Sequence, residues 1–181
     1  MKFKNLEMTG FKSFSEKTTV LIEKGLTGIV GPNGCGKSNI VEALRWCMGE
    51  NSAKSMRGTG MEDVIFSGTS NRPSKNISEV SLLLDNLEKN GPSQYKEFDE
   101  ISIKRKIEKD KGSKYYINEK EVRARDVQTF FADLSTGAHS PSLISQGRIG
   151  QLVTAKPIER KSILEEAAGI SGIHARRQEA E

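Results

Sequence analysis

The 181-residue chain contains few cysteines and no long apolar run, and these shortages exclude several classes of protein. Its two cysteines, Cys35 and Cys47, are not placed for a structural disulfide, and no CxxC spacing or histidine partner completes a metal site. No apolar stretch approaches the roughly 18 residues that a membrane-spanning helix needs. The first residues also lack the charged and then apolar pattern of a leader. We therefore expect a cytoplasmic protein with reduced thiols and no membrane segment.

The charge balance is only mildly basic. Lys and Arg total 28 against 24 Asp and Glu, which gives a net charge of +4. This excess permits contact with nucleic acid but is equally typical of an ordinary protein surface. The length suffices for one domain with a core, or for one domain with an appendage.

The hydrophobic pattern predicts strands in the first thirty residues and a helix soon after them. Strands are expected within 2–11, at 17–23 and at 26–30, and the last of these leads into a glycine-rich bend. From 38 to 48 apolar residues recur at helical spacing, and Glu42 and Arg45 fall off the apolar stripe.

Alternating apolar residues between about 76 and 124 predict consecutive antiparallel hairpins, which we interpret as a β-rich sublobe. A further short strand is expected at 63–66. Helices are expected at 125–135 and 156–170, the second with Pro157 in its first turn. The polar residues that follow are helix-favouring and have no cap, so we expect the helix to continue beyond the sequence.

The segment GPNGCGKS, from Gly31 to Ser38, matches the phosphate-binding pattern G-x-x-x-x-G-K-[ST]. Gly34 and Gly36 allow backbone conformations that a Cβ would obstruct, so several N–H groups can converge on one anion. Lys37 is expected to bridge the β- and γ-phosphates, and the Ser38 hydroxyl to bind Mg²⁺. The expected nucleotide-binding residues in and beside the loop are Pro32, Asn33, Gly34, Cys35, Gly36, Lys37, Ser38 and Asn39. A guanine-specific [NT]-K-x-D motif is absent, which favours ATP.

An acidic residue that could activate water is not evident in the sequence. Hydrolysis needs carboxylates at a strand end, and the sole candidate is Asp85 in VSLLLDN. Asn86 follows it where a Glu is usual, and this dipeptide is also typical of a hairpin turn. The LSTG at 134–137 lacks the second Gly and the Gln of an ABC signature motif, and a helix end explains it better.

Several segments, in order, resemble the N-terminal part of the head of SMC (structural maintenance of chromosomes) proteins of the bacterial type. They are GFKSF at 10–14, the P-loop and helix at 31–50, MRG at 56–58, MEDVIFSG at 61–68, ISQG at 144–147 and ILEEAAGI at 163–170. The resemblance implies an α/β fold, namely an ABC/SMC-type P-loop NTPase half-head with an antiparallel β-rich sublobe. Residues 1–170 would form the N-terminal lobe, and 171–181 would begin a truncated coiled-coil arm.

The resemblance also implies roles for individual residues. Gln146 matches the Q-loop glutamine, whose oxygen would reach Mg²⁺ and sense the γ-phosphate; without the resemblance it is simply a polar residue ending a strand. Arg57 matches an arginine that acts as an arginine finger within its own head. Lys12 and Asp63 are expected to approach the nucleotide. The expected catalytic set is therefore Lys37, Arg57 and Gln146.

The same resemblance implies partners. ATP would lie between two heads, so the expected partners are a C-terminal half-head of the same chain and a second SMC protomer in a homodimer. Accessory condensin-type subunits and double-stranded DNA, bound without sequence preference, complete the set. Candidate DNA contacts are Lys54, Lys104 and Lys106, although isolated basic residues on strands are more typical of solvated surface.

The expected function is ATP-driven engagement and disengagement of heads on DNA, in chromosome condensation and segregation. The signature motif and catalytic acid would belong to the C-terminal half, so this segment alone is expected to be inactive. Two alternatives stay open. A self-contained P-loop kinase or ATPase would need Asp85 as its acid, and a nucleotide-binding module would work without turnover.

Overall fold

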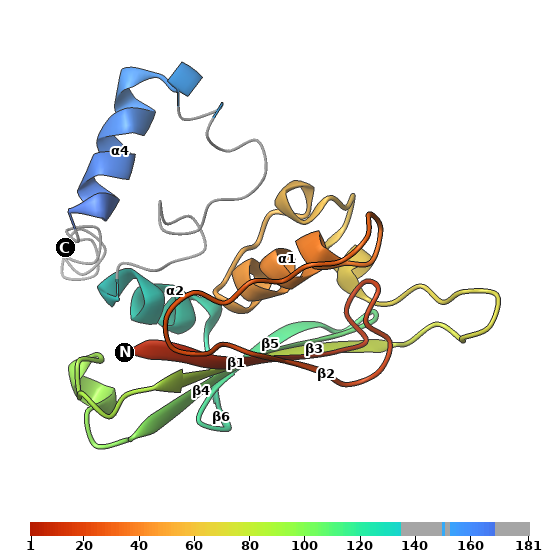
Figure 1. Ribbon diagram of the computed structural model, residues 1–181, viewed down its shortest axis with the longest axis horizontal. Coiled ribbons are helices and arrows are strands. Elements are labelled where there is room, and N and C mark those ends of the chain that lie inside the picture. The colour runs from red at the N-terminus through yellow and green to blue at the C-terminus, as the bar shows by residue number, and fades with distance from the viewer. Residues whose placement is uncertain (135–149, 151–152, 169–181) are drawn as a thin grey trace.

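The computed structural model describes residues 1–134, 150 and 153–168 (Figure 1). Its main feature is one six-stranded antiparallel sheet with the strand order β2-β1-β3-β4-β5-β6. The strands are β1 (Lys2–Thr9), β2 (Thr18–Leu21), β3 (Ile77–Asp85), β4 (Glu100–Glu108), β5 (Gly112–Ile117) and β6 (Lys120–Val122). The helices are α1 (Lys37–Cys47), α2 (Ala124–Asp133) and α4 (Pro157–Ala167), with short 3₁₀ turns η1 (Lys54–Met56), η2 (Met61–Val64) and η3 (Ser93–Tyr95).

The core lies between one face of the sheet and the helices α1 and α2, which Figure 1 shows on the same side of the strands. The predicted alternation in β3 and β4 is confirmed, because Leu82 faces Ile103 and Leu84 faces Ile101 across the pair, all four buried. Each such side chain contributes roughly 1.5–3 kcal/mol when it is fully buried. Trp46 of α1 and the two phenylalanines of α2 belong to the same cluster.

The β-rich segment is not separate from the N-terminal strands. β3 pairs with β1 along its length, with Met8 opposite Val80, so the predicted hairpins of 76–124 and the strands before the P-loop form one sheet. Alternation of apolar and polar residues predicts that a segment is a strand, but it does not show which other strand will pair with it. The hairpin predictions themselves are confirmed.

The predicted strand at 26–30, directly before the P-loop, is not formed, so this prediction was wrong for the structure described here. Leu26 and Val30 are 100% and 94% exposed. An apolar segment becomes a strand only when a neighbouring strand supplies hydrogen bonds and a surface to cover it. The predicted strand at 63–66 was also wrong, since η2 takes its place and only a single bridge joins Ile65 to Phe11.

Helix α1 is confirmed within one residue of its predicted bounds, but its buried face differs from the prediction. Glu42 and Arg45, which the apolar stripe placed outside, are both buried. Each is paired: Glu42 with Lys12 and Arg57, and Arg45 with Glu50. Pairing is what makes burial of a charged group tolerable, and a hydrophobicity pattern does not reveal it.

The C-terminal end of α1 is held by Arg105 from β4, a residue that no pattern in the sequence indicated as important. Its guanidinium lies between the rings of Trp46 and Tyr115, at 4.5 and 4.7 Å from their centroids. Nη1 donates to the carbonyl oxygens of Trp46 at 2.9 Å and Glu50 at 2.6 Å. Trp46 O lies in the last turn of α1, where it also accepts from Gly49 N at 3.2 Å, and Glu50 O lies just beyond the helix. Arg105 therefore caps this end of α1 and opposes its dipole. Burial lowers the pKa of Arg105 from its ordinary value.

Among the described residues, no helix combines the length and apolar character that crossing a bilayer requires.

Candidate nucleotide-binding site

The P-loop has the backbone that its glycines predict. Gly34 and Gly36 have φ angles of +83° and +98°, in the left-handed region. At Gly36 an added Cβ would come within 2.7 Å of Ser13 Oγ and 3.3 Å of Phe14 Cζ. The segment 10–14 therefore packs directly on the loop, and glycine at position 36 is required both by conformation and by space.

The loop opens outward at the positive end of α1. Residues 31–35 are exposed, and α1 begins without a side-chain cap and without an acidic residue in its first turn. The dipole at this end is therefore not neutralised by the helix's own first turn. An exposed glycine-rich loop running into an uncapped helix is a geometry that binds phosphate.

Lys37 folds back over the loop. Its Nζ donates to the carbonyl oxygens of Gly31 and Pro32, both at 2.6 Å, and lies 3.8 Å from Cys35 Sγ. The ammonium is thus held at the loop by acceptors that a phosphate oxygen could replace. Ser38 follows Lys37 in the first turn of α1, and its side chain is exposed. A hydroxyl oxygen is a hard donor of the kind that Mg²⁺ prefers, so Ser38 is suited to bind this metal.

Two of the predicted site residues, Lys12 and Arg57, meet at Glu42, an acid that no sequence motif placed in the site. The carboxylate of Glu42 accepts a hydrogen bond from Lys12 Nζ and forms an ion pair with Arg57 Nε. Arg57 Nη2 also donates to Asn39 Oδ1 at 2.8 Å, and Asn39 Nδ2 donates to Ser13 Oγ at 2.9 Å. The only sequence signal for Glu42 was an acid one turn after the P-loop, which is typical of a solvent-facing position.

The two cations of this network have unusual backbone conformations. Lys12 has φ +47° and Arg57 has φ +55°, angles that are uncommon for residues other than glycine. Hydrogen bonds hold both residues in place. Lys12 N donates to Val64 O at 2.7 Å and Lys12 Nζ donates to Met56 O, while Arg57 N donates to Lys54 O at 3.0 Å. Such conformations persist where the surrounding structure fixes them, often at functional sites.

Asp63 stabilises a turn. Its Oδ2 accepts from Thr59 N at 2.6 Å, Gly60 N at 3.0 Å and Thr59 Oγ1 at 3.0 Å. These hydrogen bonds, with a smaller contribution from the charge of Lys12, lower the pKa of Asp63. Its predicted approach to the nucleotide stays a prediction, and the role visible in the structure is to shape the loop beside Lys12.

The three candidate DNA contacts do not lie together. Lys54 is exposed in η1, beside Arg57, whereas Lys104 and Lys106 face away from the core of the sheet that α1 covers. Lys104 Nζ lies 2.9 Å from both carboxylate oxygens of Glu119, and Lys106 lies opposite Glu79 on β3. These two lysines are therefore part of a mixed-charge face.

The turn interpretation of Asp85 is confirmed. Its Oδ1 accepts the N–H of Leu87 at 2.9 Å, and the buried Asn86 side chain donates to Tyr95 O and Phe98 O. In the sheet, Asp85 of β3 lies opposite Lys2 at the start of β1. The segment that touches the P-loop follows the other end of β1. Because β1 has 8 residues, its ends are separated by roughly 24 Å. Asp85 is therefore remote from Lys37.

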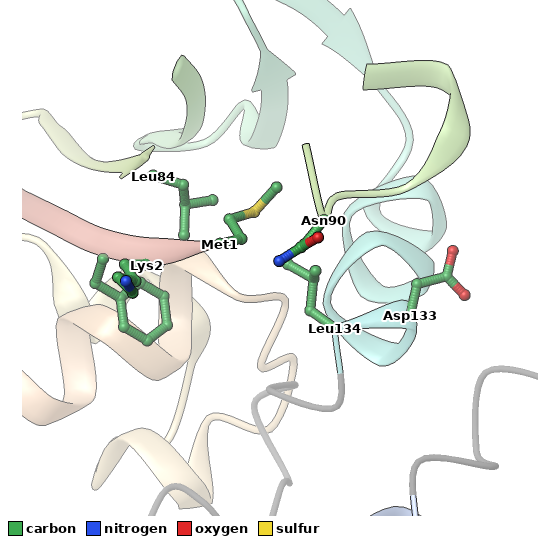
Figure 2. Close-up of a pocket in the computed structure, with 7 residues that line it drawn as sticks. Met1, Lys2, Leu84, Asn90, Asp133 and Leu134 are labelled. Atoms are coloured by element: carbon green, nitrogen blue, oxygen red, sulfur yellow. The ribbon is translucent and has the colours of Figure 1, made fainter. Parts of the chain in front are cut away.

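A cavity of about 300 Å³ also lies at this distant end (Figure 2). Its lining residues include Met1, Lys2 at the start of β1, Leu84 of β3, Asn90, and Asp133 and Leu134 at the end of α2. It belongs to the join between α2 and the sheet, and not to the P-loop.

Gln146 and the segments 144–147 and 171–181 lie outside the described residues, so the Q-loop and the start of a coiled coil stay predictions.

Residues 2–147 match the RecF/RecN/SMC N terminal domain family. The chain belongs to this family. Within it, the chain is 58% identical over 181 residues to the Chromosome partition protein Smc of Cereibacter sphaeroides, an alignment that covers 100% of this chain and 16% of that protein. The chain thus spans about 16% of the length of the first curated SMC relatives that it matches.

Solved SMC heads share the fold. The SmcHead bound to the C-winged helix domain of ScpA has 29% sequence identity and a TM-score of 0.87, over 98% of this chain and 55% of that chain. A structure from work on ATP-driven dimerization and DNA-stimulated activation of SMC ATPases has 30% identity and a TM-score of 0.78, over 92% and 99%. The predicted SMC family and the α/β half-head fold are confirmed.

Proposed function

We propose that this chain forms the ATP-binding part of an SMC head that acts in chromosome condensation and segregation. The observation that carries the proposal is the open P-loop at the uncapped start of α1, with Lys37 held over it, in a chain of the SMC family. The curated relatives' name, Chromosome partition protein Smc, supports the biological role.

ATP and Mg²⁺ fit the residues present. The loop backbone and the Lys37 ammonium suit a triphosphate, and the Ser38 hydroxyl would hold Mg²⁺ together with Gln146. When bound, the metal would neutralise negative charge on the phosphoryl group during transfer. Arg57 would contribute a second positive charge from the same head.

The acid for hydrolysis would come from a C-terminal half-head of the same protein. Asp85 is remote from the loop, and the apolar residues Leu26, Ile29 and Val30 are exposed immediately before it. An exposed segment with apolar side chains that is not yet part of a sheet can pair with a strand of another domain and bury those side chains there. This segment is therefore the proposed contact with that half-head.

ATP shared between the heads of a homodimer would favour the engaged state, and hydrolysis would release it. Accessory condensin-type subunits are further proposed partners, as the ScpA-bound structure of a related head suggests by analogy. Double-stranded DNA would bind in the cytoplasm through phosphate contacts, independently of sequence and weakened by salt. Lys54 is the best placed of the three candidate DNA contacts, because it is exposed in η1 close to Arg57, whose side chain contacts Asn39 of α1.

The test is ATP hydrolysis by this chain alone and by the chain combined with its C-terminal half-head. We expect no turnover from the chain alone and measurable turnover from the combination. Gln146→Ala should slow hydrolysis while leaving nucleotide binding largely intact, and Arg57→Ala should slow hydrolysis. Brisk turnover by the chain alone would instead favour a self-contained ATPase, and binding without turnover in any combination would favour a nucleotide-binding module.

A further inference from the structure

Glu42 is an acid in an unusual position. It lies on the buried side of α1, yet its two carboxylate oxygens are divided between two cations from different loops. Oε2 pairs with Lys12 of the 10–14 segment, and Oε1 pairs with Arg57 of the 53–58 segment. One carboxylate thus ties both loops to the helix that begins at the P-loop.

The two cations differ in exposure. The Lys12 side chain is only 13% exposed, and its ammonium is engaged by Glu42 and by Met56 O. The Arg57 side chain is 58% exposed, although its Nε and Nη2 are anchored to Glu42 and Asn39. A guanidinium has five N–H groups in a planar fork, so two anchors leave the outer edge able to contact an anion. Lys12 therefore supports the network, whereas Arg57 can reach a ligand.

The anchors also set where that outer edge lies. Asn39 is in the first turn of α1, next to Ser38, and Glu42 is less than one turn further along the helix. Both partners of Arg57 therefore belong to the element whose N-terminus would bind phosphate. A long arginine side chain loses substantial rotamer freedom when it is held, and two charge-assisted or polar contacts on one helix restrict it.

We propose that Glu42 is a positioning residue that holds Arg57 beside the phosphate-binding end of α1. The inference rests on the proposed ATPase function and deepens it. Glu42 would not touch the nucleotide. It would fix the direction of the guanidinium before ATP arrives, with Lys12 holding the carboxylate in place.

The test is a double-mutant cycle on ATP hydrolysis in the full-length protein. Glu42→Gln keeps the side-chain shape but removes the charge, so we expect kcat to fall roughly tenfold while KM for ATP changes less than about threefold. Arg57→Ala should have a similar effect. If Glu42 acts through Arg57, then Glu42→Gln in the Arg57→Ala background should lower kcat no further.

A matched control is available at the other end of α1. Glu50 is a buried acid whose Oε2 lies 2.8 Å from Arg45 Nη2. Glu50→Gln disturbs a comparable buried ion pair, so any effect it has on kcat should multiply with that of Arg57→Ala. Thermal unfolding of each variant checks that it is folded.

A second cycle with Glu42→Asp, which keeps the charge and shortens the side chain, serves if Glu42→Gln does not fold. We expect Glu42→Asp to lower kcat only when Arg57 is present. Multiplying effects of the Glu42 and Arg57 substitutions, or a change in KM with kcat intact, would overturn the positioning role. A wild-type protein that binds but does not hydrolyse ATP would overturn the proposed function itself, and this inference with it.

Discussion

The N-terminal end of α1 is exposed and its C-terminal end is buried, although charged side chains surround both ends. At the first end, Lys37 lies over an open loop and Arg57 keeps an exposed edge. At the second end, Arg105 is 2% exposed and is enclosed by Trp46 and Tyr115. Basic side chains are therefore exposed to water at the N-terminal end of α1, whereas at the C-terminal end Arg105 contacts aromatic rings and carbonyl oxygens.

This difference separates binding from support. A cation held loosely at a surface can exchange its carbonyl partners for phosphate oxygens, because neither state is strongly desolvated. A buried guanidinium cannot move without leaving acceptors unpaired in a low-dielectric site. The exposed end of α1 can thus respond to a ligand, while the buried end fixes the helix against the sheet.

The largest effect on folding should come from the buried end. Arg105→Ala would leave the Trp46 and Glu50 carbonyls without this donor and open a space between two rings, so we expect a loss of about 3–4 kcal/mol in the free energy of unfolding. Urea denaturation of the chain measures it. Arg105→Met, which fills the space without donating, should cost less; equal stability of wild type and Arg105→Ala would contradict the capping role.

The exposed end should respond in the opposite way. Lys37→Ala removes a surface cation whose partners are solvated carbonyls, so the free energy of unfolding should change by less than about 0.5 kcal/mol. ATP binding by the full-length protein should be lost or weakened by roughly 100-fold, because the charge that faces the phosphates is gone. Titration with a fluorescent ATP analogue checks this. Unchanged affinity would remove the assigned role of Lys37.

The two cysteines give the smallest and most specific contrast, since Cys35 is exposed near the first end and Cys47 is buried near the second. Burial raises the pKa of Cys47 from 9.0 to about 12. An unfolded thiol ionises above pH 9 while the folded one stays protonated, so the contribution of Cys47 to stability should be constant below pH 9. It should then fall, by up to about 1.4 kcal/mol per pH unit, as the pH rises toward 12.

Cys47→Ala should remove this contribution and leave a shallower decline. The pKa of the neighbouring Tyr115 is raised to about 12 by burial, so some alkaline loss should persist in the variant. Denaturation midpoints at a series of pH values provide the measurement. Identical slopes for wild type and Cys47→Ala would show that Cys47 does not titrate as its burial predicts.

Much of the fold and the phosphate site was predictable because the signals are local. Alternation predicted β3 and β4, helical spacing predicted α1 and α2, and Pro157 predicted the start of α4. The loop glycines predicted a backbone that a Cβ would obstruct at positions 34 and 36, and both residues have positive φ angles. In each case, neighbouring residues alone determine the preferred backbone.

The features that the sequence did not predict correctly depend on contacts between residues that are far apart along the chain. Lys12 and Glu42 are 30 residues apart, and Arg105 and Trp46 are 59 apart. No local pattern distinguishes a paired, buried charge from a solvated one, and so Glu42 and Arg105 were missed. The segment 26–30 failed for the related reason that a strand needs a neighbour, which its own sequence does not provide.

The amino-acid sequence by itself determined the phosphate cradle and the periodicity of its strands and helices, because these follow from short-range sterics and from which face of an element is apolar. Only the tertiary structure decided which charges are buried, which loops meet at Glu42, and that Asp85 lies at the opposite end of the sheet from Lys37. Those outcomes depend on desolvation and pairing, which exist only when distant segments are brought together.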